Sequence, residues 1–257
     1  RLSLSLALAA QSSMAFGGCG EGKCTDCHSL SKEQATEALA PLGIAAEVID
    51  VKLAKVPGLW SIAVFDKKNN RKLPIYLDYS KKYLIQGEVI EIATKESLTR
   101  LSMAELNRVN PGEIPLDDAV VVGKPDAKLR VIVFDDPECP YCKKFQEEMN
   151  KVVAKRSDIA FFIKMLPLKI PPKARQKSEA IICAKSLELL EKSLAGEEIP
   201  APTCKTDQID KNEALAAKLE IRSTPTFILP DGRVFPGARN AEDVIKLIDS
   251  PLPPEKK

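Results

Sequence analysis

The cysteines at positions 139 and 142 are the residues of this chain best suited to redox chemistry. Only Pro140 and Tyr141 separate them, and two thiols at this spacing can close into a disulfide and open again. One sulfur attacks a disulfide as a thiolate, and the other can release the resulting mixed disulfide. We predict that Cys139 is the nucleophile and Cys142 the resolving thiol. The alternatives are a static disulfide and half of a zinc site.

The elements around this pair place it where a thiolate is favoured. An apolar run over residues 129–134 predicts a buried strand, and a helix is predicted from about residue 141 to 156. Cys139 then lies at the helix N-terminus, where free backbone N–H groups and the helix dipole favour negative charge. Pro140 suits the first helical turn because no intrahelical hydrogen bond is lost there.

Charged residues beside the pair act in opposite directions on its thiols. Lys143 and Lys144 favour the thiolate, whereas the acidic residues just upstream oppose it. These acids are Asp135, Asp136 and Glu138. The sequence leaves the net effect on the pKa of Cys139 open.

A second cysteine motif lies near the N-terminus. Cys24 and Cys27 are followed directly by His28, the only histidine. This C-x-x-C-H spacing is the attachment signature of c-type haem, in which both sulfurs bind the porphyrin and the imidazole binds iron. The alternatives are a second dithiol or disulfide, and a zinc site that adds Cys19. Cys19 is also a candidate for lipid attachment at a membrane, or for a free or intermolecular thiol.

The opening segment and the composition indicate an exported protein. Residues 1–15 combine Arg1 with a short apolar run and small residues, as in the remains of a signal peptide. The seven cysteines suit a compartment where disulfides persist. The net charge is +2, from 38 basic and 36 acidic residues. This balance creates no basic field, so we expect no nucleic-acid partner.

Hydrophobic periodicity divides the rest of the chain into two folded regions. The first begins with a short amphipathic helix and continues with strand-like runs over residues 48–53, 60–65, 73–77 and 83–92, which predicts an antiparallel meander on one helix. The second alternates strands with helices and includes a helical stretch over residues 174–195. The predicted segments are 16–30 with the C-x-x-C-H motif, 31–96, a linker helix over 97–115, 116–252, and a polar tail over 253–257.

The motifs together resemble the bacterial periplasmic disulfide isomerases of the DsbC and DsbG type, over about residues 33–250. The resemblance is carried by residues 133–142, by Cys183 and Cys204, by residues 222–226, and upstream by residues 56–60 and 83–89. It implies an α+β N-terminal dimerisation domain, a cystatin-like meander plus helix. A linker helix would join this domain to an α/β thioredoxin-like domain with a helical insertion.

The resemblance also implies roles for residues far from the cysteine pair. Thr224 and a cis Pro225 would form the backbone edge that holds the substrate chain, next to Pro140 and Tyr141; a trans proline at a strand entrance is the alternative. Cys183 and Cys204 would form a structural disulfide, which would stabilise the fold by roughly 3 kcal/mol in the chain-entropy model. Two unpaired buried thiols are the alternative.

The function implied is that of a periplasmic homodimer that isomerises or reduces disulfides through Cys139 and Cys142. Its substrates would be misfolded or oxidised exported proteins, and a membrane reductase of the DsbD type would keep it reduced. The Pro140-Tyr141 dipeptide is closer to DsbG and the later cysteine pair closer to DsbC, so the choice between scrambled disulfides and oxidised single cysteines stays open. The thiol chemistry needs no cofactor. Two other functions remain: a haem c electron-transfer module coupled to the dithiol, and a dimeric holdase chaperone.

Overall fold

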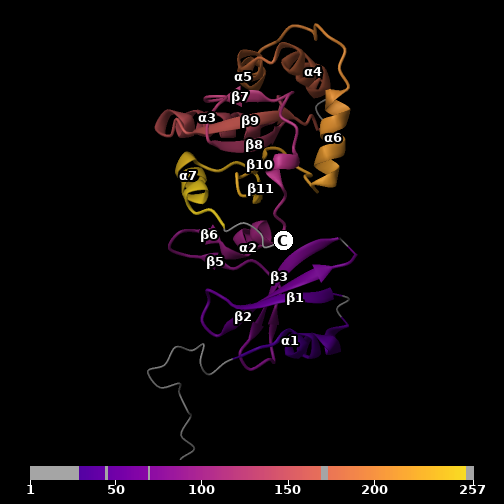
Figure 1. Ribbon diagram of the computed structural model, residues 1–257, viewed down its shortest axis with the longest axis vertical. Helices are drawn as coiled ribbons and strands as arrows, with labels where there is room; N and C mark the ends of the chain where they lie inside the picture. Colours follow the sequence, from indigo (N-terminus) through magenta and orange to yellow (C-terminus); the bar gives the residue numbers. More distant parts are fainter. Residues whose placement is uncertain (1–28, 44–45, 69, 169–172, 253–257) are drawn as a thin grey trace, which may run out of the picture. The chain divides into compact units, whose positions relative to one another are not determined.

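The computed structural model describes residues 29–43, 46–68, 70–168 and 173–252. Contacts divide the chain into two compact units, Arg1–Gly87 and Glu88–Lys257 (Figure 1). The predicted signal segment, the C-x-x-C-H motif and the polar tail lie outside the described residues. Among those described, no helix is both long enough and apolar enough to cross a membrane.

The first unit opens with helix α1 (Lys32–Leu39), whose N-terminus is fixed by a capping box. The Ser31 hydroxyl accepts a hydrogen bond from the backbone N–H of Gln34 at 3.2 Å, and the Gln34 side chain accepts one from the N–H of Ser31 at 3.1 Å. A 3-10 turn (Ala40–Leu42) follows and ends at Gly43 in the left-handed conformation.

Four antiparallel strands complete the first unit. They are β1 (Ala46–Leu53), β2 (Leu59–Asp66), β3 (Arg71–Asp78) and β4 (Leu84–Ile85), hydrogen-bonded in this order. Alternate side chains of β2 and β3 form a core with α1, made of Ala35, Leu39, Trp60, Ile62, Val64, Ile75 and Leu77. The predicted meander packed on one helix is therefore present.

The single strand predicted over residues 83–92 is wrong. The structure has β4 at the end of the first unit and a separate short strand, β5 (Ile90–Glu91), in the second. The apolar side chains that suggested a strand are exposed, among them Tyr83, Ile90 and Ile92. Because no core buries them, Gly87 can interrupt the extended run without loss of packing.

The second unit is built around a five-stranded sheet of order β11-β10-β8-β9-β7. Its strands are β7 (Val120–Val122), β8 (Leu129–Asp135), β9 (Ile159–Met165), β10 (Thr226–Ile228) and β11 (Val234–Pro236). Strands β8 and β9 are parallel, and the other neighbours are antiparallel. Helices α3 (Pro140–Lys155) and α7 (Ala241–Asp249) cover one face, and α6 (Gln208–Lys218) lies on the other (Figure 1).

Strand β8 is buried on both faces because its side chains alternate between two cores. Val131 and Val133 belong to the cluster that includes α3 and α7, whereas Ile132 and Phe134 belong to the cluster that includes α6. This arrangement explains why residues 131–134 are continuously apolar, whereas Arg130 at the start of the strand is exposed. It also brings the C-terminal end of β8 directly to the start of α3.

A helical insertion separates β9 from α6, and it consists of two helices instead of the single stretch predicted over residues 174–195. Helix α4 (Ala174–Ala184) ends at Lys185, which is left-handed with φ 46°. Helix α5 (Leu187–Ala195) begins after Ser186, whose hydroxyl accepts a hydrogen bond from the N–H of Leu189 at 3.2 Å. Capping by Ser186 satisfies a helix-end donor and so favours the break.

The segment before the sheet also belongs to the second unit. It contains β5, β6 (Glu96–Ser97), α2 (Leu98–Leu106) and a 3-10 helix (Pro111–Glu113). Ala104 is buried in the main core of the unit. The N–H of Val109 donates to the carbonyl of Gly232 at 2.9 Å, and Gly232 has φ +88° and backbone too close to Val109 for a side chain. Of the single linker helix predicted over 97–115, the structure has α2 over Leu98–Leu106 only, followed by a 3-10 helix, and both belong to the second unit.

Candidate active site

The cysteine pair lies at the junction of β8 and α3, as the sequence predicted. Cys139 occupies the N-cap position of α3, with Pro140 in the first turn, and no side chain caps the helix there. The N–H of Cys139 donates to the carbonyl of Asp136 at 3.0 Å, and the carbonyl of Cys139 accepts from the N–H of Lys143 at 3.1 Å. The Cys139 thiol is left facing the free N–H groups of the first helical turn.

The two thiols have opposite acidities. The pKa of Cys139 is lowered to about 6, chiefly by a hydrogen bond from the Cys142 thiol and further by the backbone N–H groups of Cys142 and Tyr141, against a desolvation effect that raises it. Burial raises the pKa of Cys142, and this residue has no exposed surface. Both thiols are free in the structure. At neutral pH Cys139 is therefore a thiolate, and Cys142 holds its proton.

Thr224 and Pro225 lie opposite Cys139, on the loop between α6 and β10. Their peptide bond is cis, as predicted. The Cys139 sulfur lies 3.5 Å from the carbonyl oxygen of Thr224, and the N–H of Gly237 donates to the carbonyl of Pro225 at 2.7 Å. The chain thus presents a backbone edge next to the Cys139 sulfur.

Tyr141 is the larger of the two exposed residues of the Pro140-Tyr141 dipeptide. Its side chain is 63% exposed, and the ammonium of Lys144 lies 5.7 Å from the centre of its ring. Tyr141 is therefore available at the surface beside Cys139, whereas Pro140 starts the helix.

The three acidic residues before Cys139 have different environments. Asp135 is fully buried, and desolvation raises its pKa well above the usual value, partly offset by the Cys142 thiol. Among the described residues, no conventional hydrogen-bond partner reaches either of its oxygens. Asp136 accepts from the N–H of Glu138 at 2.8 Å and the N–H of Leu168 at 2.7 Å, and desolvation raises its pKa too. The expected opposition to the thiolate is weakened because burial favours the neutral form of both aspartates.

Three residues that sequence reasoning missed also hold the site. Leu168 binds Asp136 through its N–H, Lys177 of α4 forms an ion pair with Glu138 at 3.0 Å, and the Ser193 hydroxyl of α5 donates to the carbonyl of Pro137 at 2.9 Å. All three follow β9 in the chain, and no spacing rule connects them to the cysteine motif. Only the folded position of the insertion shows their role.

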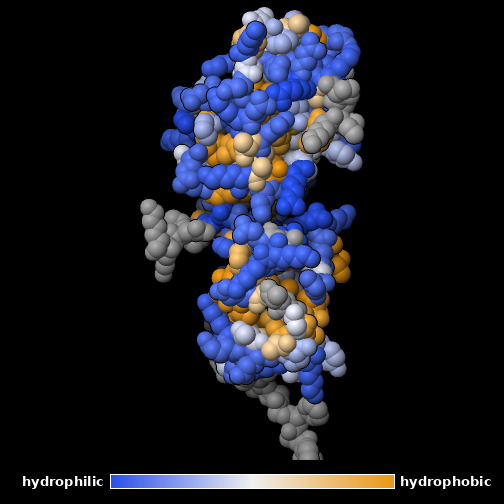
Figure 2. Space-filling model, turned by 90° about the vertical axis from the view of Figure 1, so that its right-hand side faces the viewer, coloured by the Kyte–Doolittle hydropathy of each residue, from blue (hydrophilic) through white to orange (hydrophobic). Residues whose placement is uncertain are grey.

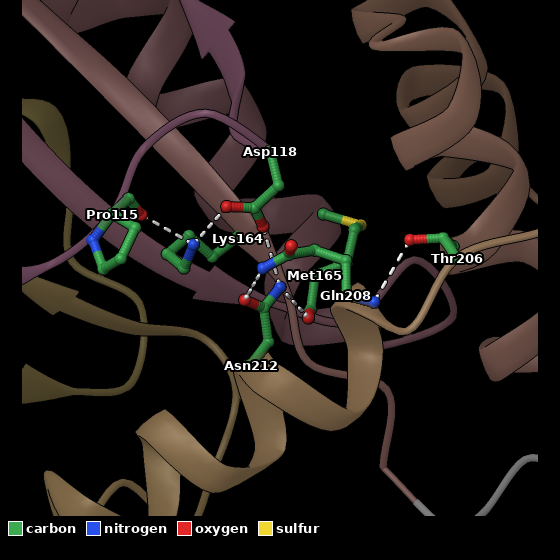
Figure 3. A network of polar contacts seen from close by, with 7 residues as sticks. All are labelled: Pro115, Asp118, Lys164, Met165, Thr206, Gln208 and Asn212. Atoms are coloured by element: carbon green, nitrogen blue, oxygen red, sulfur yellow. Dashed lines mark hydrogen bonds and ion pairs between the residues drawn. The ribbon is translucent and has the colours of Figure 1, made fainter.

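A buried polar network links α6 to the end of β9 on the other face of the sheet (Figure 3). Lys164 forms an ion pair with Asp118 and donates to the carbonyl of Pro115 at 2.8 Å. Asn212 of α6 donates to Asp118 at 2.9 Å and to the carbonyl of Met165 at 3.0 Å. Met165 is the cross-strand partner of Asp135, so the network fixes α6 beside the strand end that carries the site.

The remaining predicted residues fall into two groups. Cys183 and Cys204 form a disulfide with a sequence separation of 21, which confirms that pairing and ties α4 to the segment before α6. Cys19, Cys24, Cys27 and His28 lie outside the described residues. Within the described ranges, no group of three or more His, Cys, Asp or Glu side chains is placed to hold a metal ion.

Sequence comparison finds curated relatives that are named thiol:disulfide interchange protein DsbC. The probable thiol:disulfide interchange protein DsbC of Bordetella avium is 29% identical over 157 residues, which cover 61% of this chain and 55% of that protein. The thiol:disulfide interchange protein DsbC of Dickeya dadantii is 25% identical over 179 residues, 68% of this chain and 72% of that protein. The chain spans little more than half the length of the Bordetella relatives that it matches.

A solved structure and a family model each match about half of this chain. A disulfide interchange protein from Neisseria gonorrhoeae is 25% identical, with a TM-score of 0.44 over 52% of this chain and 96% of that one. The family model described as a thioredoxin-like domain matches residues 116–250, more than half of the 257 residues. This chain belongs to the family of proteins with a thioredoxin-like domain.

Proposed function

We propose that this protein catalyses thiol–disulfide exchange, as an isomerase or reductase of disulfides in exported proteins. One observation carries the proposal: the half-exposed Cys139 has a pKa of about 6, while Cys142 beside it is buried and protonated. A thiolate at neutral pH is the form that attacks disulfides. The names of the DsbC relatives support the same activity.

The chemistry needs only the two cysteines and a substrate disulfide. The Cys139 thiolate attacks one substrate sulfur, so a mixed disulfide forms and the other substrate sulfur leaves as a thiolate. In isomerisation, the freed substrate thiolate attacks a second substrate disulfide, which releases another substrate thiolate. A substrate thiolate then attacks the substrate sulfur of the mixed disulfide, so a new substrate disulfide forms and Cys139 leaves as a thiolate. In reduction, Cys142 loses its proton and attacks Cys139, which releases the reduced substrate and leaves a Cys139–Cys142 disulfide. A membrane reductase of the DsbD type is the proposed electron donor that restores the dithiol.

The substrate chain is proposed to lie along the edge formed by Thr224 and Pro225. The carbonyl of Thr224 is 3.5 Å from the Cys139 sulfur, so a peptide paired with this backbone would bring its own sulfur to the nucleophile. Tyr141 and Leu168 are exposed apolar side chains of the same region of the chain. They would contact apolar residues of misfolded substrates, which expose such residues more than folded proteins do.

The first unit is proposed to form a homodimer. Strands β1 and β4 are the two edges of its sheet, and Leu53 of β1 and Ile85 of β4 are exposed. Figure 2 shows hydrophobic side chains at the surface of this unit among hydrophilic ones. Edge strands with exposed apolar side chains are available for pairing with a second copy. Light scattering at micromolar concentration should give the mass of two chains, and a single-chain mass would contradict the dimer.

The N-terminal motif supports a second, separate proposal. Cys24, Cys27 and His28 have the spacing for covalent haem c, which would make the chain an electron-transfer protein as well. Periplasmic location, with or without a lipid on Cys19, would provide the compartment in which this attachment occurs. An absorption spectrum and intact mass after export in a haem-attaching host test it, since an unmodified mass would remove the proposal.

The activity itself is tested by refolding of a scrambled substrate. The wild type should restore native disulfides, and Cys139→Ser should abolish turnover because no other described cysteine is a free, partly exposed thiol. A Cys183→Ser/Cys204→Ser variant is the matched control and should retain activity. Full isomerase activity in Cys139→Ser would overturn the proposal. Suppression of aggregation without any isomerase activity in the wild type would instead favour a holdase.

A further inference from the structure

Both helices of the insertion form polar contacts with the turn between β8 and α3. The ammonium of Lys177, on α4, lies 3.0 Å from a carboxylate oxygen of Glu138. The hydroxyl of Ser193, on α5, donates to the carbonyl of Pro137 at 2.9 Å and is buried. The two residues just before Cys139 are therefore each bound by one helix of the insertion.

The ion pair between Lys177 and Glu138 is shielded from solvent. The two side chains are 12% and 15% exposed, whereas most ion pairs of this unit join more exposed groups. One example is Lys173 and Glu198, which are 66% and 81% exposed and 3.4 Å apart. Shielding weakens the screening by water and salt, so the charge of Glu138 acts on its surroundings more strongly than a surface charge does.

The charge of Glu138 matters because this residue directly precedes the nucleophile. A carboxylate next to Cys139 disfavours a second negative charge on the sulfur. Burial already favours the neutral forms of Asp135 and Asp136, so neither needs a cation to weaken its effect. Glu138 is the acid of this turn that forms an ion pair, and its partner, Lys177, belongs to the insertion.

We propose that Lys177 is a positioning residue of the active site, which compensates the charge of Glu138 and, together with Ser193, holds the turn that presents Cys139. This role rests on the proposed thiol–disulfide activity and adds a specific use for the insertion. Lys177 acts through Glu138.

The other charged or titratable groups around Cys139 act differently. On α3 these are Cys142, which donates to the Cys139 sulfur, and Lys143 and Lys144, which are exposed. Lys144 lies over the ring of Tyr141. The loop opposite contributes the carbonyl of Thr224, and Arg222 on that loop is exposed. Solvent screens the exposed cations, so they replace Lys177 only in part.

The experiment measures the pH dependence of Cys139 alkylation in the reduced full-length chain. Iodoacetamide is the probe, and fragmentation mass spectrometry of the peptide that contains both Cys139 and Cys142 assigns the alkyl group to one sulfur or the other. The variants are Lys177→Gln, Lys177→Arg, Glu138→Gln and the double variant Lys177→Gln/Glu138→Gln. Lys173→Gln is the matched control, because it removes a lysine near the start of the same helix from an exposed pair.

Charge compensation predicts a distinct pattern among these variants. Lys177→Gln should raise the pKa of Cys139 by about 0.5 to 1, and Lys177→Arg should leave it near the wild-type value. Glu138→Gln should not raise it, and the double variant should return close to wild type. Lys173→Gln should change nothing. If the Lys177–Glu138 ion pair only holds the turn in place, Glu138→Gln and Lys177→Gln should raise the pKa of Cys139 equally, because both break the same ion pair.

The outcomes separate this inference from the proposed activity. A low pKa of Cys139 in the wild type that is unchanged in Lys177→Gln overturns the role of Lys177 and leaves the proposed activity standing. Equal upward shifts in Glu138→Gln and Lys177→Gln also overturn it. An ordinary pKa of Cys139 in the wild type contradicts both. If Lys177→Gln does not fold, a raised pKa in the folded Glu138→Gln variant overturns the inference, and a lowered one supports it.

Discussion

The sulfur of Cys139 lies 3.5 Å from the backbone carbonyl oxygen of Thr224, although 85 positions separate the two residues in the chain. The contact joins the start of α3 to the loop before β10. Because β10 is the direct neighbour of β8 in the sheet, the nucleophile and the proposed substrate edge are held by adjacent strands. Their spacing is therefore fixed by the most deeply buried part of the second unit.

The low pKa of Cys139 predicts that the reduced protein gains stability as pH rises. The thiolate is favoured in the folded state, with a pKa of about 6 against an ordinary value of 9.0. Stability from this group is complete above pH 9 and is lost as pH falls through 6. Urea unfolding of the reduced protein at pH 5 and pH 8 should show the gain, and reduced Cys139→Ser should lack it. An equal pH dependence in both proteins would contradict the assignment.

Cys142→Ser should trap the first half of the reaction. The Cys139 thiolate can still attack, but no internal thiol can resolve the product, so a mixed disulfide with the substrate should accumulate. Intact mass spectrometry after incubation with an oxidised peptide would detect the adduct. Cys139→Ser is the control and should form none, because Cys142 has no exposed surface. Adducts on Cys142 in that control would reverse the assigned roles.

Asp135→Asn should stabilise the protein at neutral pH. The pKa of this buried carboxyl is raised by desolvation, so its favourable contribution is complete below the ordinary value of 3.8 and is lost as pH rises toward the folded value. Relative to the wild type, the variant should therefore be more stable at pH 7 than at pH 4. Urea unfolding at both pH values is the measurement, with exposed Asp126→Asn as control. A gain that does not depend on pH would point to packing instead.

Removal of the Cys183–Cys204 disulfide should lower the free energy of unfolding and leave the reactivity of Cys139 and Cys142 unchanged. Cys183→Ser/Cys204→Ser removes a link across 21 positions, which should cost roughly 3 kcal/mol in the chain-entropy model. Denaturant unfolding under non-reducing conditions measures the loss, and alkylation of Cys139 monitors the site. An unchanged midpoint of unfolding would mean that the disulfide does not restrict the unfolded chain enough to stabilise the fold.

Lys164→Met should be strongly destabilising, because it leaves Asp118 buried without its cation. Removing one member of a buried ion pair typically costs about 3 to 5 kcal/mol. The double variant Lys164→Met/Asp118→Leu should recover part of the loss, since no isolated charge then remains. Unfolding curves of the three proteins form the comparison. A double variant less stable than the single one would show that Asp118 serves mainly Asn212, to which it is bound at 2.9 Å.

The parts of the fold that could be predicted from the sequence are those with strong local patterns. The apolar residues of β8 predicted a buried strand, and the position of Cys139 before Pro140 predicted the start of α3. The break between α4 and α5 was missed because a left-handed Lys185 gives no composition signal. The strand expected over residues 83–92 was wrong because apolar periodicity does not show whether a core is present to bury it.

Only the site residues marked by a local motif or by the family resemblance could be predicted from the sequence. Cys139 and Cys142 were named from their spacing, and Thr224, Pro225, Cys183 and Cys204 from resemblance. The effect of the three acids on the thiolate could not be settled, because it depends on burial and on partners such as Lys177 and Leu168. Those partners come from the insertion and the loop after β9. Contacts between residues this far apart in the chain produce no periodic pattern in a single sequence.

The hydrogen bond between Val109 and Gly232 determines where a stable fragment of the second unit can begin. The family match begins at residue 116, but Ala104 is part of the main core and Val109 is bonded to the β10–β11 turn. A fragment that starts at 116 would expose apolar core surface and leave the carbonyl of Gly232 without its donor. The second unit should therefore be produced from residue 88 onward, where the compact unit begins.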